Sequence, residues 1–243
     1  GIAIIIFSLI FIQPDLGTAV IFLGIVATLF FISPVHKKIK NQTFLAALML
    51  IVFGALILTN SGAKIFQDRQ LERLNFKNPC SRLLSTGDQV CNGYIAINNG
   101  GLGGVGLGNS TQKYLYLSEP YTDFIFAIIV EELGFIIGAV IIILEGLVLW
   151  RIIKIGKNSY TNRGALMCYG ICVYIFLHII INLGGLLGLI PLTGVPLPFM
   201  SYGGSFTLCL MISIAIVERV AVETGIRNEV KSSDNSSRKK LKK

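Results

Sequence analysis

Long apolar runs dominate this chain, and short polar or basic segments separate them. The apolar runs cover residues 1–12, 16–32, 44–58, 124–150, 165–189 and 206–217. Several approach or exceed the ~20 residues that an α-helix needs to cross the hydrocarbon core of a bilayer. We therefore predict an all-α fold, a polytopic bundle of transmembrane helices with about six spans.

Basic segments predict the orientation of the bundle. Lysine and arginine cluster at residues 36–40 and 151–163, and short loops rich in these residues stay on the cytoplasmic side. The hydrophilic stretch 61–120 is then a large external loop, and the Pro/Gly-broken stretch 190–205 shares its side. The tail 225–243, rich in Ser, Lys and Arg, is expected to be disordered, basic and cytoplasmic.

The composition agrees with a membrane protein and restricts its partners. The 243 residues are 53% hydrophobic and 14% charged, which is unusual for a soluble domain of this size. The net charge of +8 does not indicate a nucleic-acid partner. Much of the excess positive charge lies beside apolar runs, where basic side chains contact anionic lipids. The chain starts without Met inside an apolar run, so we expect an N-terminal portion to be missing.

Asp123 is the leading candidate for chemistry, because it lies where a polar loop meets an apolar run. A carboxylate is costly to bury in hydrocarbon, so one retained at this boundary suggests function. Glu119 lies four residues earlier, on the same face if the segment is helical. Paired carboxylates can divide into a base and a modulating neighbour. The alternative is that both stabilise a helix N-terminus.

Polar side chains inside the predicted spans are further candidates. Glu145 either has a polar partner in the bundle or a function. His178 and Asn182, one helical turn apart in the next span, are expected to form interhelical hydrogen bonds.

The glycine-rich segment 100–108 contains a G-x-G-x-x-G pattern. Because the strand–turn–helix context of a dinucleotide site is missing, a tight backbone that admits a bulky substrate is the favoured interpretation. Lys113, just after it, is a candidate for binding phosphate as a point charge. A solvated loop lysine is the equal alternative.

The five cysteines divide into two groups. Cys168, Cys172 and Cys209 lie in apolar runs and are expected to be buried thiols. Cys80 and Cys91 lie in the external loop, where a disulfide can persist. The two histidines lie elsewhere in the sequence, so we predict no metal site.

Four motifs follow one another along the chain. They read QPDLGTA at 13–19, GLGNSTQK at 106–113, EPYTDFIFA at 119–127 with EELG at 131–134, and PLPFMSYGGS at 196–205. They resemble signatures of the SEDS family, which includes FtsW, RodA and SpoVE, and the second favours the FtsW/SpoVE branch. The resemblance extends to about residue 220. Ser118 and Tyr121 replace the family's proline and histidine, and tyrosine does not exchange protons near neutral pH.

The resemblance implies a fold of about ten spans, of which residues 1–224 would supply about six as one membrane domain. It implies a peptidoglycan glycosyltransferase of the bacterial plasma membrane that polymerises lipid II through β-1,4 links, releasing undecaprenyl pyrophosphate, during septal or sporulation wall synthesis. Asp123 would be its catalytic residue. The substrate-binding residues would be Lys113, Gln112, Glu119, Asp15, Ser201, Gly203, Gly204 and Ser205.

The resemblance also implies partners. These are lipid II, a class B penicillin-binding protein, other divisome proteins and membrane lipid, and Mg²⁺ or Mn²⁺ is a candidate cation for the pyrophosphate. Two alternative functions remain open. One is a lipid II flippase, for which Glu145 inside the membrane would matter, and the other is a non-catalytic scaffold that recruits a transpeptidase.

Overall fold

The computed structural model describes residues 15–43, 45, 79–81, 86–117 and 119–241. All regular elements within these ranges are helices. The predicted span at 1–12, the predicted span at 44–58 apart from residue 45, and residues 61–78, 82–85 and 118 of the predicted external loop lie outside the described residues.

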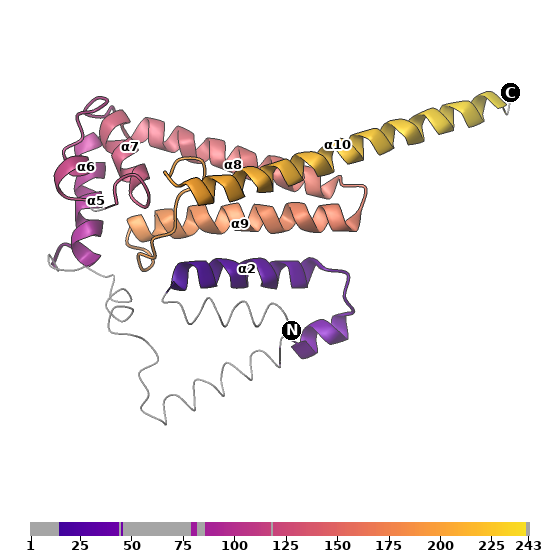
Figure 1. Cartoon of the computed structure of the whole chain (residues 1–243), viewed down its shortest axis with the longest axis horizontal. Coiled ribbons are helices and arrows are strands. Elements are labelled where there is room, and N and C mark those ends of the chain that lie inside the picture. Colours follow the sequence, from indigo (N-terminus) through magenta and orange to yellow (C-terminus); the bar gives the residue numbers. More distant parts are fainter. Residues whose placement is uncertain (1–14, 44, 46–78, 82–85, 118, 242–243) are drawn as a thin grey trace.

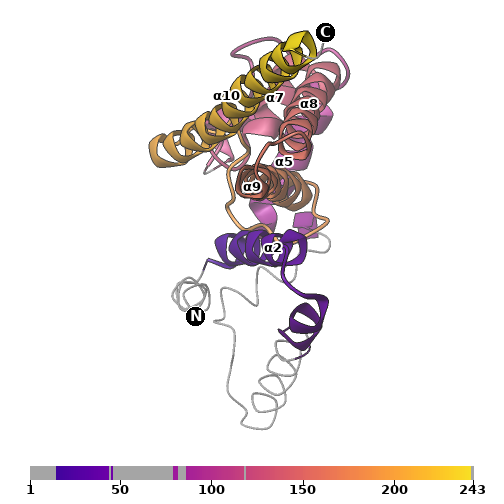
Figure 2. The ribbon, with the colours of Figure 1, turned by 90° about the vertical axis from the view of Figure 1, so that its right-hand side faces the viewer.

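Within the described ranges, three helices are long and apolar enough to cross a membrane. They are α8 (Phe135–Lys157), α9 (Asn162–Leu186) and α10 (Gly204–Leu241), the last counted as far as Lys231. The shorter apolar helix α2 (Leu16–Ile32) lies beside them. Helix α9 lies between α2 on one side and α8 and α10 on the other (Figures 1 and 2). The prediction of a polytopic helical membrane fold is confirmed.

Small residues allow α2 and α9 to pack closely, as is common between membrane helices. A Cβ added at Gly24 would lie 2.4 Å from Leu177 Cδ1, and one added at Gly170 would lie 3.3 Å from Leu29 Cδ2. Each helix therefore places a leucine against a glycine of the other. On its opposite face, α9 buries Cys168 and Ile175 completely in the main core.

The run predicted as one span, 124–150, is divided into α7 (Ile125–Leu133) and α8. Gly134 separates them with a φ of 87°, and a Cβ there would lie 2.3 Å from Leu102 O. The amides of Val105 and Gly106 donate to the carbonyls of Glu131 and Glu132, at 2.9 and 3.0 Å. The close backbone approach predicted for the glycine-rich segment is therefore an approach to the end of α7.

The described part of the predicted external loop is largely helical. It contains η1 (Pro79–Ser81), α5 (Thr86–Gly100) and α6 (Gln112–Leu115), and α5 packs against α7. The predicted disulfide is present, because Cys80 and Cys91 join η1 to α5 with 4.9 Å between their Cα atoms.

Two further sequence predictions differ from the structure. Cys168 and Cys172 are buried as expected, but Cys209 lies on an exposed face of α10. The tail 225–243 was expected to be disordered, yet α10 continues to Leu241 and extends beyond the turn between α8 and α9 (Figure 1). Between residues 226 and 241 the chain contains neither Gly nor Pro, and Lys, Arg and Glu are compatible with helix.

The disulfide can be tested by mass spectrometry of the alkylated protein. We expect Cys80 and Cys91 to react with iodoacetamide only after reduction and unfolding, because both sulfurs are otherwise in the bridge. Cys209 serves as the internal control, because its thiol is free and should react in the unfolded chain without reductant. Labelling of Cys80 and Cys91 in the unreduced, unfolded chain would contradict the pairing.

Candidate functional site

Residues 121–124 form a turn that leads into α7, and three successive carbonyls of this turn are held by other parts of the chain. Tyr202 N donates to Tyr121 O at 2.9 Å, and Ser201 Oγ donates to Thr122 O at 2.6 Å. Asn182 Nδ2 donates to Asp123 O at 2.9 Å. The backbone that carries Asp123 is therefore fixed from α9 and from the loop before α10.

Asn182 connects this turn to the interior of the bundle. Its side chain is 4% exposed, and its amide also donates to Val195 O at 2.8 Å. One turn earlier on α9, His178 Nδ1 lies 3.2 Å from Pro196 O. Both residues make hydrogen bonds as predicted, but their partners are the 195–196 backbone and Asp123 rather than another span. Sequence reasoning recognised an amide inside an apolar run but missed its contact with Asp123.

Ser201 was predicted to bind substrate, and its hydroxyl is engaged within the chain. Besides donating to Thr122 O, it accepts a hydrogen bond from Leu197 N at 2.8 Å, and the residue is 8% exposed. These bonds close the 197–201 turn and attach it to the turn of Asp123. A contact between Ser201 and substrate remains a prediction.

The side chain of Asp123 is partly exposed and lies against Gly194. A Cβ at Gly194 would lie 3.2 Å from Asp123 Oδ2, and Gly194 has a φ of 75°. Substitution there would strain the backbone and crowd the carboxylate at once.

The start of α2 reaches the same end of the bundle. A Cβ at Gly17 would lie 2.6 Å from Val195 and 2.9 Å from Thr193, the neighbours of Gly194. Asp15, predicted to bind substrate, is thereby brought to the end that carries Asp123. Its carboxylate caps α2, accepting hydrogen bonds from Thr18 N at 3.1 Å and from the Thr18 hydroxyl.

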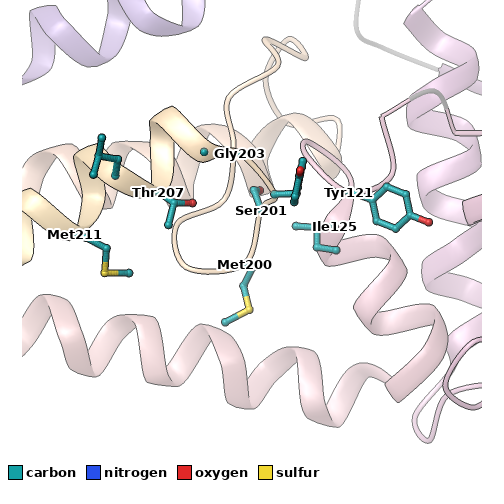
Figure 3. Close-up of a pocket in the computed structure, with 10 residues that line it drawn as sticks. Tyr121, Ile125, Met200, Ser201, Gly203, Thr207 and Met211 are labelled. Atoms are coloured by element: carbon teal, nitrogen blue, oxygen red, sulfur yellow. The ribbon is translucent and has the colours of Figure 1, made fainter.

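A groove of about 680 Å³ opens beside the turn. Figure 3 shows Tyr121 and Ile125 on one side and Thr207 and Met211 on the other, with Met200 between them. Its lining includes three residues predicted to bind substrate, Ser201, Gly203 and Gly204. Ser205, also predicted, is exposed at the start of α10 and does not line the groove.

The other end of α7 carries a buried carboxylate that sequence reasoning did not single out. Glu131 is 1% exposed and accepts hydrogen bonds from the Ser110 hydroxyl and from Thr111 Oγ1, the latter at 3.3 Å. Thr111 N and Asn99 Nδ2 lie 3.4 Å from its Oε1. This carboxylate therefore joins α5 and the 110–111 segment to α7.

The predicted phosphate ligand Lys113 has a carboxylate partner. Its Nζ lies 2.9 Å from Glu132 Oε1, and both side chains are largely buried. The hydrogen bond to Glu132 raises the pKa of Lys113 above its ordinary value. Burial alone would raise the pKa of Glu132, but the bonds from Lys113 and from the amides of Gly108 and Ser110 outweigh it and lower that pKa. The pair therefore stays charged near neutral pH.

Two predicted substrate-binding residues remain, Gln112 and Glu119. Gln112 is 6% exposed, and its Oε1 has no hydrogen-bond partner among the described residues. Glu119 is exposed and accepts a hydrogen bond from Thr122 Oγ1 at 3.1 Å. Because α7 begins only at Ile125, Glu119 and Asp123 do not form the helical pair that the spacing suggested.

A divalent cation at the site would need several protein ligands close together. Within the part of the chain that the structure describes, no three side chains of His, Cys, Asp or Glu gather in a geometry that would hold a metal ion. The described residues therefore do not fit a cation held by protein ligands alone.

These features define a helical membrane protein with a carboxylate fixed on a turn at one end of its bundle. The chain belongs to the FtsW/RodA/SpoVE family, described as cell cycle proteins, whose model matches residues 1–226.

Curated relatives agree with this assignment. The chain is 37% identical over 222 residues to "Stage V sporulation protein E" of Bacillus subtilis, covering 91% of this chain and 58% of that protein. It is 39% identical over 239 residues to "Probable peptidoglycan glycosyltransferase FtsW" of the same organism, covering 97% of this chain and 57% of the relative. The chain thus spans a little over half the length of these relatives.

A solved structure shares the fold. The chain superposes with a TM-score of 0.68 and 23% identity on a protein from work titled "Structural coordination of polymerization and crosslinking by a peptidoglycan synthase complex". The match covers 91% of this chain and 60% of the other.

The role of Glu131 can be tested by substitution. Glu131→Gln replaces one acceptor oxygen by a donor that faces Ser110 and Thr111, so we expect a loss of about 1–3 kcal/mol in stability. The measurement is the thermal unfolding midpoint of the complete protein in detergent. Glu119→Gln, at an exposed carboxylate, should change stability by less than about 0.5 kcal/mol. Equal midpoints for the two variants would contradict the role of Glu131.

Proposed function

We propose that this chain forms part of a peptidoglycan glycosyltransferase that polymerises lipid II into β-1,4-linked glycan strands during septal or sporulation wall synthesis. The observation that carries the proposal is the partly exposed Asp123 on a turn whose backbone is held by hydrogen bonds at one end of the bundle. Tyr121 and Ile125, on either side of Asp123 in the sequence, line the groove there. The family and the names of the curated relatives support the same activity.

Asp123 acts as the general base in this proposal. The 4-hydroxyl of the acceptor sugar gives its proton to the carboxylate while its oxygen attacks the anomeric carbon of the donor. The bond from that carbon to the pyrophosphate oxygen breaks, and undecaprenyl pyrophosphate leaves with the bonding electrons. Displacement from the opposite side inverts an α-linked donor to a β-1,4 product.

The three carbonyl bonds of the 121–123 turn explain why such a base would be effective. A catalytic group gains most of its rate advantage from being held in position before the reaction. The turn is bonded to α9 through Asn182 and to the 201–202 segment, so the backbone beneath the carboxylate does not need to be ordered when substrate binds. The adjoining groove, lined by apolar and small residues, suits a bulky lipid-linked sugar.

The leaving pyrophosphate needs positive charge. Lys113 was the first candidate, but its ammonium is already paired with Glu132, roughly 10 Å along α7 from the first residue of that helix. Lys113 would reach pyrophosphate only by exchanging partners. Because the described residues do not gather as a metal site, a Mg²⁺ or Mn²⁺ ion would have to be bound largely by the pyrophosphate itself.

The proposal includes a location and partners. The protein lies in the bacterial plasma membrane with the basic ends of α8 and α10 in the cytoplasm, which positions Asp123 outside. A class B penicillin-binding protein would cross-link the new strands beside it, together with other divisome proteins. The shared fold with a chain of a peptidoglycan synthase complex is consistent with such a partner.

Glu145 favours a second candidate function, a lipid II flippase. This residue of α8 is 3% exposed, and neither of its carboxyl oxygens has a hydrogen-bond partner among the described residues. A buried carboxyl inside a membrane span is a functional candidate by default. The third possibility, a scaffold that only recruits a transpeptidase, gains no support from a particular contact.

Substitution of Asp123 separates these functions. Asp123→Asn keeps the shape of the side chain and removes the base, so we expect glycan synthesis from purified lipid II to fall by at least about 100-fold. The assay uses the complete protein with its transpeptidase at matched amounts, and product strands are resolved by gel electrophoresis. Thermal unfolding and binding of the transpeptidase should not change.

Glu145→Gln is the matched amide substitution inside the membrane. Under the polymerase proposal it leaves strand synthesis within a few-fold of wild type. If Glu145→Gln stops lipid II translocation in vesicles while Asp123→Asn has no effect on translocation or synthesis, the flippase is favoured. If neither variant changes either assay, the scaffold is favoured.

Asn182 should act as a positioning residue. Asn182→Leu leaves Asp123 O and Val195 O without their donor, so we expect kcat to fall about tenfold or more while KM changes less than about twofold. His178→Leu is the control, because it removes a bond to the same loop without touching the Asp123 turn. Equal losses of kcat in both variants would indicate a general structural role for α9.

A further inference from the structure

A second cleft lies at the end of the bundle that carries the basic residues, between the last turns of α8 and the middle of α10. Its volume is about 240 Å³. Its lining comprises Arg151, Lys154, Ile155, Asn158, Ala221, Thr224, Gly225 and Asn228. The proposed glycosyl transfer uses none of these residues.

The charge of this cleft is unbalanced. Two cations and three hydrogen-bonding side chains line it, and none of the lining residues is acidic. Within the described part of the chain, neither Arg151 nor Lys154 forms a salt bridge. Two carboxylates of α10, Glu223 and Glu229, adjoin lining residues in the sequence without lining the cleft, and Glu223 lies 4.0 Å from Arg227, which also does not line it. The cleft therefore favours an anion.

Aromatic side chains indicate the depth of the cleft in the membrane. Trp150 and Tyr160 are 57% and 54% exposed, and Trp and Tyr concentrate at the level of lipid headgroups. Lys154 Nζ lies 5.1 Å from the Trp150 ring, and Arg227 Cζ lies 4.5 Å from the Tyr160 ring. The lining residues of α8 and the loop after it, 151–158, lie between these two aromatic residues in the sequence, so we expect the cleft at the level of lipid phosphates.

Two lining residues of α10, Thr224 and Gly225, differ in how closely the chain packs against them. Thr224 Oγ1 donates to Val220 O at 2.8 Å and accepts from Tyr160 N at 3.3 Å, which joins the loop after α8 to α10. A Cβ added at Gly225 would meet no atom within 4 Å. A ligand can therefore enter beside Gly225 without displacing the chain.

We propose that this cleft binds the phosphate of an anionic phospholipid headgroup. Arg151 and Lys154 supply the positive charge, and the Asn158 and Asn228 amides can donate hydrogen bonds to phosphate oxygens. Basic pockets between membrane helices are established sites for such headgroups. The bound lipid would bridge the ends of α8 and α10.

The test measures lipid retention by native mass spectrometry of the complete protein in detergent. The probes are phosphatidylglycerol and phosphatidylcholine with the same acyl chains. We expect phosphatidylglycerol to be retained preferentially, and the double variant R151Q/K154Q to weaken its retention about tenfold or more. The control K157Q/R163Q removes one lysine and one arginine from the same end of the bundle, outside the cleft, and should lose less than about threefold.

A second variant tests whether lipid retention depends on the open space of the cleft and not only on its positive charge. Gly225→Leu keeps both cations and fills open space, so the protein should fold normally and still lose phosphatidylglycerol retention. Equal losses in the two double variants, or full retention in Gly225→Leu, would reduce the effect to general surface charge and overturn the site. Displacement of the lipid by millimolar inorganic phosphate would show that a free anion, not a headgroup, is the ligand, and would also overturn it.

Discussion

The hydrogen bonds to the carbonyls of Tyr121, Thr122 and Asp123 are the constraint on which the site depends. Without these donors, the carbonyls of a turn at the edge of a membrane would have to form hydrogen bonds with water. Here the Asn182 amide, the Ser201 hydroxyl and the Tyr202 amide satisfy all three. Because the donors come from α9 and from the segment before α10, any movement of either element shifts the Asp123 backbone.

At the C-terminal end of α7, a buried carboxylate, an ion pair and backbone hydrogen bonds hold the helix in place. The Glu131 carboxylate collects hydrogen bonds from the 110–111 segment, the Lys113–Glu132 pair lies beside it, and the glycine-rich segment bonds the last carbonyls of the helix. The disulfide between Cys80 and Cys91 attaches η1 to the second turn of α5, which packs along α7. The short helix α7, which begins two residues after the candidate base, is thus supported at both ends and along α5.

Apolar periodicity and length were sufficient to predict the helical membrane fold, and the polar-to-apolar boundary was sufficient to single out Asp123. The break at Gly134 was missed because the run 124–150 has the length and the mainly apolar composition of one continuous span, despite Glu131 and Glu132 just before the glycine. The roles of Asn182 and Glu131 were missed because they depend on contacts 59 and 21 residues away in sequence. The helical tail was missed because polar composition indicates disorder even where every residue tolerates a helix.

The most direct test of this account is a structure of the complete protein bound to a non-hydrolysable lipid II analogue and an acceptor strand. The account predicts the acceptor 4-hydroxyl about 3 Å from a carboxylate oxygen of Asp123, with the three carbonyl bonds of the turn intact. An acceptor bound productively while the Asp123 carboxylate points away from every sugar hydroxyl would contradict it.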